Sequence, residues 1–435
     1  MSARGLCLAS LLAGCSGNHP GFPNGVPDAP GDTLSSMTGD AAPDAVTLTV
    51  TAHGAAVPGV AVYFQTSDSS LVLAATTDEH GTAGAVLPPG GYVTVIEPDD
   101  GTGIARLATI AATQPRDALH LDLAPTGPTD AATFAATVPT LSGAAYYRLF
   151  TSCGQLVANA SGAASGELLG CGDAADVVVI AGDQNGVILG SLYAADVPVA
   201  REPAALTGTY SALVATQFAY AGVPAASDAV TTYQAIETAR GRLFDTATSG
   251  SVVAGLASTT LDLPATTGAI GLTISSAQPA VTAVSEQRVF DWGPWRSSYT
   301  LDLASAMLPA FAGVPTYDPA TRSISWSEQG GGTPPDLVRA RVHVYRDAIP
   351  EGRSWTWAIV APRGAAASVA LPRLPAGGFD FNPGATDTID VDDLLSASVP
   401  RGYDAVRTHG FDDIQTFVAG PSGRIVAETL YTPPL

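Results

Sequence analysis

"GVAVYFQTSDSSLVLAATTDEHGTAGAVLPPGGYVTVIEP", residues 59–98, decides the fold. Apolar side chains alternate in it with small or polar ones, and Val60, Val62 and Phe64 share one side of the first run. A period of two places successive side chains on opposite faces of a β-strand. Asp78 and Gly81 mark a turn, because Asp makes local side-chain hydrogen bonds and Gly accepts a positive φ. The stretch therefore predicts short strands with one buried face.

Similar runs continue along the chain, separated by Gly, Pro, Asp and Asn at a spacing of roughly ten residues, which is typical of β-sandwiches. Asn185-Gly186 is a strong hairpin signal. Residues 228–244 are the ambiguous segment, since Asp228 could open a helix there while the Thr content favours strands. We predict an all-β protein of tandem β-sandwich (Ig-like) domains. The expected domains are 45–124, a small disulfide-tied β domain at 125–200, a β domain at 201–285, and an aromatic-rich β domain at 286–435.

The first of these domains resembles a known family. Pro58-Gly59-Val60 precedes an alternating strand, Thr77-Asp78-Glu79-His80-Gly81-Thr82-Ala83 forms a turn, and Gly90-Gly91-Tyr92-Val93-Thr94-Val95 begins another strand. Together they resemble bacterial Ig-like and carboxypeptidase-regulatory-like sandwich domains over residues 45–124. The resemblance implies a spacer, stalk or adhesion module, and it transfers no catalytic residue.

The amino terminus contains the parts of an export signal. Arg4 is followed by a short apolar run and the small residues Ala13 and Gly14, and the run is too short for the roughly 20 residues that span a bilayer. Leu12-Ala13-Gly14-Cys15 resembles the bacterial lipoprotein signal, which implies removal of residues 1–14 and lipidation of Cys15. Ser16 implies export to the outer membrane, on its periplasmic or cell-surface side. Residues 15–44 are rich in Gly, Pro, Asn and Ser and predict a disordered tether.

Four cysteines are present. Cys7 lies in the expected signal and Cys15 carries the expected lipid. Cys153 and Cys171 remain as one pair in an exported protein, so a disulfide between them is predicted.

The charge balance excludes several classes of function. The formal net charge is −21, which argues against nucleic acid as a partner. All 19 basic residues are Arg and no Lys is present. The chain therefore has no P-loop, no Schiff-base lysine and no Ser-x-x-Lys nucleophile.

Two clusters in the last third of the chain are candidate ligand-binding residues. Trp355 and Trp357 fall on one face of a predicted strand and could stack on sugar rings, although large aromatics more often form a sandwich core. Arg339, Arg341 and His343 line the outer face of the run at 337–346. They could bind an acidic partner, or they could pair with carboxylates of a neighbouring strand.

Acidic residues concentrate in three places, at Asp99-Asp100, at Asp412-Asp413, and in the run 387–393. Such clusters can bind Ca²⁺, but none matches an EF-hand loop, and we expect no metal site and no cofactor. The six histidines are scattered, and neither His-Glu-x-x-His nor Gly-x-Ser-x-Gly occurs.

These observations predict a lipid-anchored protein of the bacterial cell envelope with a binding or structural role, as in adhesion or a stalk, and without catalysis. Its partners would be the membrane through the anchor, and an envelope polysaccharide or protein. Two alternatives remain open: a carbohydrate-binding lipoprotein that uses the C-terminal aromatics, and a hydrolase that uses a pair of carboxylates.

Overall fold

A computed structural model describes most of the chain after residue 43. The described residues are 44–52, 55–97, 104–123, 131–225, 227–238, 240–264, 270–279, 285–294, 296–330, 334–347, 352–375, 379–408 and 424–431. Nearly all of their regular structure is strand, so the predicted all-β fold is confirmed. The expected signal, Cys15 and the expected tether up to residue 43 lie outside these residues.

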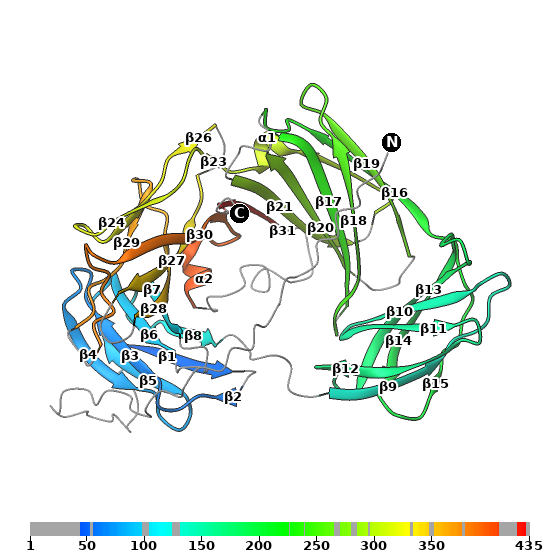
Figure 1. The fold of residues 1–435 in the computed structure, drawn as a ribbon, viewed down its shortest axis with the longest axis horizontal. Helices are drawn as coiled ribbons and strands as arrows, with labels where there is room; N and C mark the ends of the chain where they lie inside the picture. The colour runs from blue at the N-terminus through cyan, green and yellow to red at the C-terminus, as the bar shows by residue number, and fades with distance from the viewer. Residues whose placement is uncertain are drawn as a thin grey trace.

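One sheet of twelve strands, called here the long sheet, runs through the molecule. Its order is β18-β17-β20-β21-β31-β30-β27-β28-β7-β6-β3-β4. In Figure 1 it curves from the blue strands β3 and β4 on one side to the green strands β17 and β18 on the other. The strands are β3 (Ala61–Gln65), β4 (Leu71–Thr76), β6 (Gly91–Ile96), β7 (Ile104–Thr113), β17 (Ser227–Thr238), β18 (Gly241–Ser251), β20 (Ile270–Pro279), β21 (Ser285–Pro294), β27 (Leu337–Arg346), β28 (Arg353–Pro362), β30 (Thr388–Ser398) and β31 (Arg424–Tyr431).

Smaller sheets share a hydrophobic core with different stretches of the long sheet, so the layers form sandwiches. One such sheet lies beside β3, β4, β6 and β7, one lies beside β17 and β21, and two short ones cover β27 and β28. The first contains β1 (Ala45–Ala52), β2 (Ala55–Ala56), β5 (Thr82–Val86) and β8 (Ala118–Asp122). The second contains β16 (Val214–Ala221), β19 (Ala257–Leu263) and β22 (Ser298–Asp302). The short ones are β23 (Ala310–Phe311) with β26 (Glu328–Gln329), and β24 (Thr316–Asp318), β25 (Ser323–Ser325) and β29 (Ser368–Ala370).

A separate sandwich, called here the small sandwich, lies beyond the β17–β18 end of the long sheet (Figure 1). Its two sheets have the orders β11-β10-β13-β14 and β12-β9-β15 and enclose a core of their own. The strands are β9 (Ala131–Thr137), β10 (Tyr146–Thr151), β11 (Gly154–Asn159), β12 (Ala163–Leu169), β13 (Ala174–Gly182), β14 (Ile188–Pro198) and β15 (Ala204–Ala205). The described chain also contains two short helices, α1 (Leu303–Ala306) and α2 (Tyr403–Arg407). Neither is long and apolar enough to cross a membrane.

The turn predicted in the opening stretch is present. The Asp78 carboxylate accepts hydrogen bonds from the backbone amides of His80 and Thr82. Gly81 has a φ of 72°, and a Cβ there would collide with the Val50 carbonyl oxygen. Only glycine therefore fits between β4 and β5 at this position.

Two findings differ from the sequence-based expectation. The helical alternative for 228–244 is wrong, because β17 and β18 form an antiparallel hairpin across it, with β17 burying alternate residues such as Val230 and Thr232. Strand pairing also crosses the expected boundaries at residues 124 and 285. β7, from the first expected domain, pairs in parallel with β28 from the last, and β20 pairs with β21.

Candidate functional site

The candidate basic residues lie on the central strand β27, which pairs with both β28 and β30. Arg341 is exposed, Arg339 and His343 are half-buried, and all three lie on one face of the strand. The predicted alternation is confirmed, since the residues between them are buried on the other face: Val338, Ala340, Val342 and Val344.

Trp355 and Trp357 lie on the opposite face from these residues. In register they are opposite Val344 and Val342, and both indoles are 0 % exposed. The interpretation of this pair as an open sugar-stacking face is therefore wrong, because the short sheets of β23–β26 and β24–β25–β29 cover that side. The indole of Trp357 donates a hydrogen bond of 2.8 Å to Thr109 on β7, so it belongs to the core.

Carboxylates from β30 neutralise the basic face. Arg339 donates a 2.7 Å hydrogen bond to Asp393, which is also opposite Arg341 in register, and His343 is opposite Asp390. The register shifts after Arg341, so that Asp392 is an extra residue on β30 between the partners of Arg341 and Val342. Burial raises the pKa of Asp392, while His343 and Arg341 act in the opposite direction. The face is therefore a mixed-charge sheet surface, as cross-strand pairing would give.

Arg346, at the end of β27, holds the acidic segment before β30. Its guanidinium donates to both carboxylate oxygens of Asp387, at 2.9 and 2.7 Å, and to the carbonyls of Asp380 and Asn382. It also lies 5.0 Å from the ring centroid of Trp355. Burial opposes ionisation of Asp387, but the bonds from Arg346 and the Gly384 amide outweigh it and lower the pKa of Asp387. Arg346 is thus a clamp that the sequence patterns did not single out.

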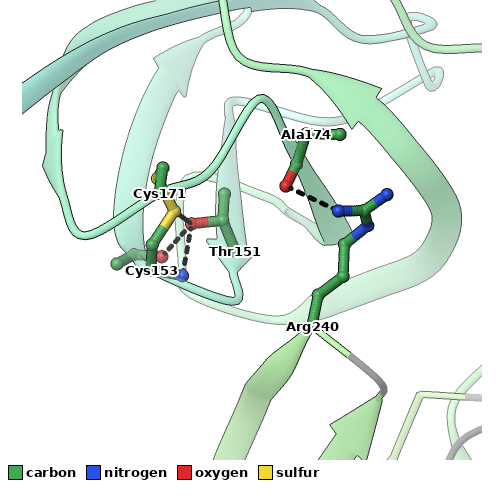
Figure 2. The surroundings of a disulfide bond; sticks show 6 residues. Thr151, Cys153, Cys171, Ala174 and Arg240 are labelled. Atoms are coloured by element: carbon green, nitrogen blue, oxygen red, sulfur yellow. Dashed lines mark hydrogen bonds between the residues drawn. A yellow bond between two sulfur atoms is a disulfide. The ribbon is translucent and has the colours of Figure 1, made fainter. Parts of the chain in front are cut away.

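The predicted disulfide joins Cys153 to Cys171, which are 18 residues apart (Figure 2). The Thr151 hydroxyl accepts a bond from the Cys153 amide and donates to the Gly154 carbonyl, fixing the turn that holds Cys153. This closes one end of the small sandwich. Chain-entropy arguments predict that such a loop adds about 3 kcal/mol to stability.

Arg240, at the tip of the β17–β18 hairpin, contacts the segment just after the disulfide. It donates to the Ala174 carbonyl at 3.4 Å, drawn in Figure 2, and to the Asp196 carboxylate at 2.9 Å. Asp176 lies 3.9 Å away and accepts from the Asp196 amide. These contacts join the small sandwich to the long sheet. Sequence reasoning missed them because it left this hairpin open to a helical interpretation.

Among the residues that the structure describes, no group of three or more His, Cys, Asp or Glu side chains is placed to bind a metal ion. Asp99-Asp100, Asp412-Asp413 and His409 lie outside these residues.

The comparisons with known proteins give little similarity. No family model matches the chain, and no curated protein matches it. Among solved structures, the Bacillus anthracis TIE protein is 12 % identical, with a TM-score of 0.15, 53 % of this chain covered and 45 % of that one. A tetra-tandem repeat from the extending region of a large adhesion protein is 13 % identical, with a TM-score of 0.11 and coverages of 82 % and 95 %. E. coli alpha-2-macroglobulin is 11 % identical, with a TM-score of 0.11 and coverages of 79 % and 26 %. This chain thus spans less than half of the first of these, and none is similar enough to carry a functional argument.

Proposed function

We propose that this protein is a lipid-anchored scaffold of the bacterial cell envelope whose role is binding or structural rather than catalytic. The observation that carries the proposal is the long sheet, in which strands from the early and late parts of the chain pair side by side. Paired backbone groups along every seam make such a sheet a stiff support for the loops and faces it presents.

Charged side chains support this interpretation because they connect distant segments. Arg407 on α2 contacts Asp117 at 2.7 Å, with both side chains less than one-tenth exposed. Arg363 contacts Glu328 at 3.1 Å, 35 residues away. Removing one partner of a buried ion pair typically lowers the free energy of unfolding by about 3–5 kcal/mol, so these pairs stabilise the contacts between distant segments.

The anchor is proposed from the sequence. Each acyl CH₂ buried in the membrane contributes about 0.8 kcal/mol, so several chains on Cys15 would hold the protein stably. The expected tether at 15–44 has a root-mean-square length of ~30 Å if it behaves as a flexible coil. The scaffold would then stand clear of the lipid headgroups, and the Ser16 signal favours the outer membrane.

Fractionation of cells tests the anchor. Wild-type protein is expected in the membrane fraction, and Cys15→Ser in the soluble fraction. Cys7→Ser is the matched control, because Cys7 would leave with the signal, and it is expected to remain with the membrane. Soluble wild-type protein, or a Cys15→Ser variant that stays membrane-bound, would overturn the proposed anchor.

A further inference from the structure

The outer face of the sheet β11-β10-β13-β14 is divided into two halves. One half is covered by the tip of the β17–β18 hairpin, where Leu243 packs in one cluster with Val178 and Ile180. Phe244 contacts Phe150 edge-to-face at 5.0 Å. The other half continues the same face along the strands. It carries residues that register places side by side: Tyr146, Arg148, Val157, Gly182 and Ile188.

Tyr146 leans across the sheet over Gly182, its partner on β13. A Cβ at position 182 would collide with Cζ and Oη of the Tyr146 ring. The ring therefore occupies the space that any other residue's side chain would fill. Gly182 does not have a positive φ, so its backbone conformation does not require glycine. Glycine is needed here because it lets the Tyr146 ring approach the backbone closely.

Arg148 is exposed and its Cζ lies 5.6 Å from the centroid of the Tyr146 ring. Within the described residues it makes no ion pair, in contrast to Arg339, Arg346 and Arg407, each of which contacts a carboxylate. Two aliphatic side chains flank it, Val157 at 69 % and Ile188 at 47 % exposure. An aromatic ring, a free guanidinium and aliphatic flanks thus share one surface.

We propose that Tyr146 and Arg148 form a binding platform for a saccharide that carries a carboxylate, such as a uronic acid. The C–H face of a pyranose ring packs on the electron-rich face of an aromatic ring. A guanidinium binds a carboxylate through two parallel hydrogen bonds. This proposal specifies a ligand class for the proposed binding role in the cell envelope, and it rests on that proposed function. It moves the sugar-binding hypothesis away from Trp355 and Trp357, which are buried.

Titration calorimetry with hexagalacturonate tests the platform, with neutral maltohexaose as the comparison. The full chain is purified in mild detergent, so the measurement does not depend on the state of Cys15. Hexagalacturonate is expected to bind and maltohexaose to bind at least tenfold more weakly. Tyr146→Ala and Arg148→Gln are each expected to weaken hexagalacturonate binding about tenfold, the loss of ~1.4 kcal/mol.

Gly182→Ala provides the sharpest variant, since it keeps both proposed contact residues and displaces only the ring. It is expected to weaken binding about tenfold, whereas Gly172→Ala is expected to bind like the wild type because nothing lies within 4 Å of a Cβ there. Circular dichroism confirms that each variant is folded. No binding by the wild type, equal binding of the two saccharides, or full binding by Tyr146→Ala would overturn the platform. If this surface binds a protein partner instead, the wild type would not bind hexagalacturonate. None of these binding results changes the outcome of membrane fractionation. Failure of the platform and failure of the anchor are therefore distinguishable.

Discussion

Replacing Trp357 by Phe tests the seam between β7 and β28. The Trp357 indole is fully buried and donates a 2.8 Å hydrogen bond to Thr109, whose hydroxyl lies 2.9 Å from that of Thr94 on β6. These bonds join β28 to β7 and β6, which are consecutive strands near the start of the described chain. The substitution removes the bond and part of the ring.

The expected cost has two parts. A lost hydrogen bond to a buried group costs about 1 kcal/mol. A cavity of ~40 Å³, at roughly 24 cal/mol per Å³, costs about 1 kcal/mol more, before the transfer free energy of the missing atoms is added. We therefore expect Trp357→Phe to lower the free energy of unfolding by about 2–3 kcal/mol. Urea unfolding followed by far-ultraviolet circular dichroism measures it.

A double-mutant cycle isolates the bond from the cavity. Trp357→Phe combined with Thr109→Val is expected to show a coupling of about 1 kcal/mol. Trp355→Phe is the matched control, because its equally buried indole nitrogen has no hydrogen-bond partner among the described residues. Trp355 is opposite Ala105, ~13 Å along the strand from Thr109, so its coupling to Thr109→Val is expected to be near zero. A coupling of zero for Trp357 would refute the hydrogen bond between Trp357 and Thr109 across the β7–β28 seam.

Three further predictions test other parts of the structure. Replacing Cys153 and Cys171 by Ala should destabilise the small sandwich by about 3 kcal/mol, measured by urea unfolding, and an unchanged midpoint would contradict a stabilising disulfide. Arg240→Ala should loosen the joint between the small sandwich and the long sheet and speed limited proteolysis there. Arg242→Ala, which loses an ion pair to Glu237 and a contact with the Tyr233 ring, both within the hairpin, should not. The lowered pKa of Asp387 means that its ionised form favours the folded state, so its contribution is present above pH 3.8 and is lost as pH falls through the lower folded-state pKa. Unfolding of Asp387→Asn at pH 7 and pH 3 should show less acid-sensitivity than the wild type, and equal sensitivity would contradict this role.

Local patterns predicted the features that depend on neighbours in sequence. The alternation at Val60, Val62 and Phe64 gave a strand with that face buried, and Asp78 with Gly81 gave the turn. The cysteine count gave the disulfide because only one pair remained in the expected mature chain. Each of these depends on a period, a turn residue or a chemical pairing that one short segment contains.

Features that depend on distant pairing could not be predicted in this way. One of the two partners of β28, the strand β7, lies about 250 residues earlier in the chain, and no local period encodes such a pairing. The period of two placed Trp355 and Trp357 on one face but could not say whether a second sheet covers it. Gly182 carries no signal in the sequence either, since its role follows from the ring on the neighbouring strand.

Mass spectrometry of the amino-terminal peptide, from protein extracted with detergent from membranes, tests the proposed anchoring most directly. We expect a chain that begins at Cys15 and carries acyl chains on that residue. A peptide that begins elsewhere, or an unmodified Cys15, would contradict it.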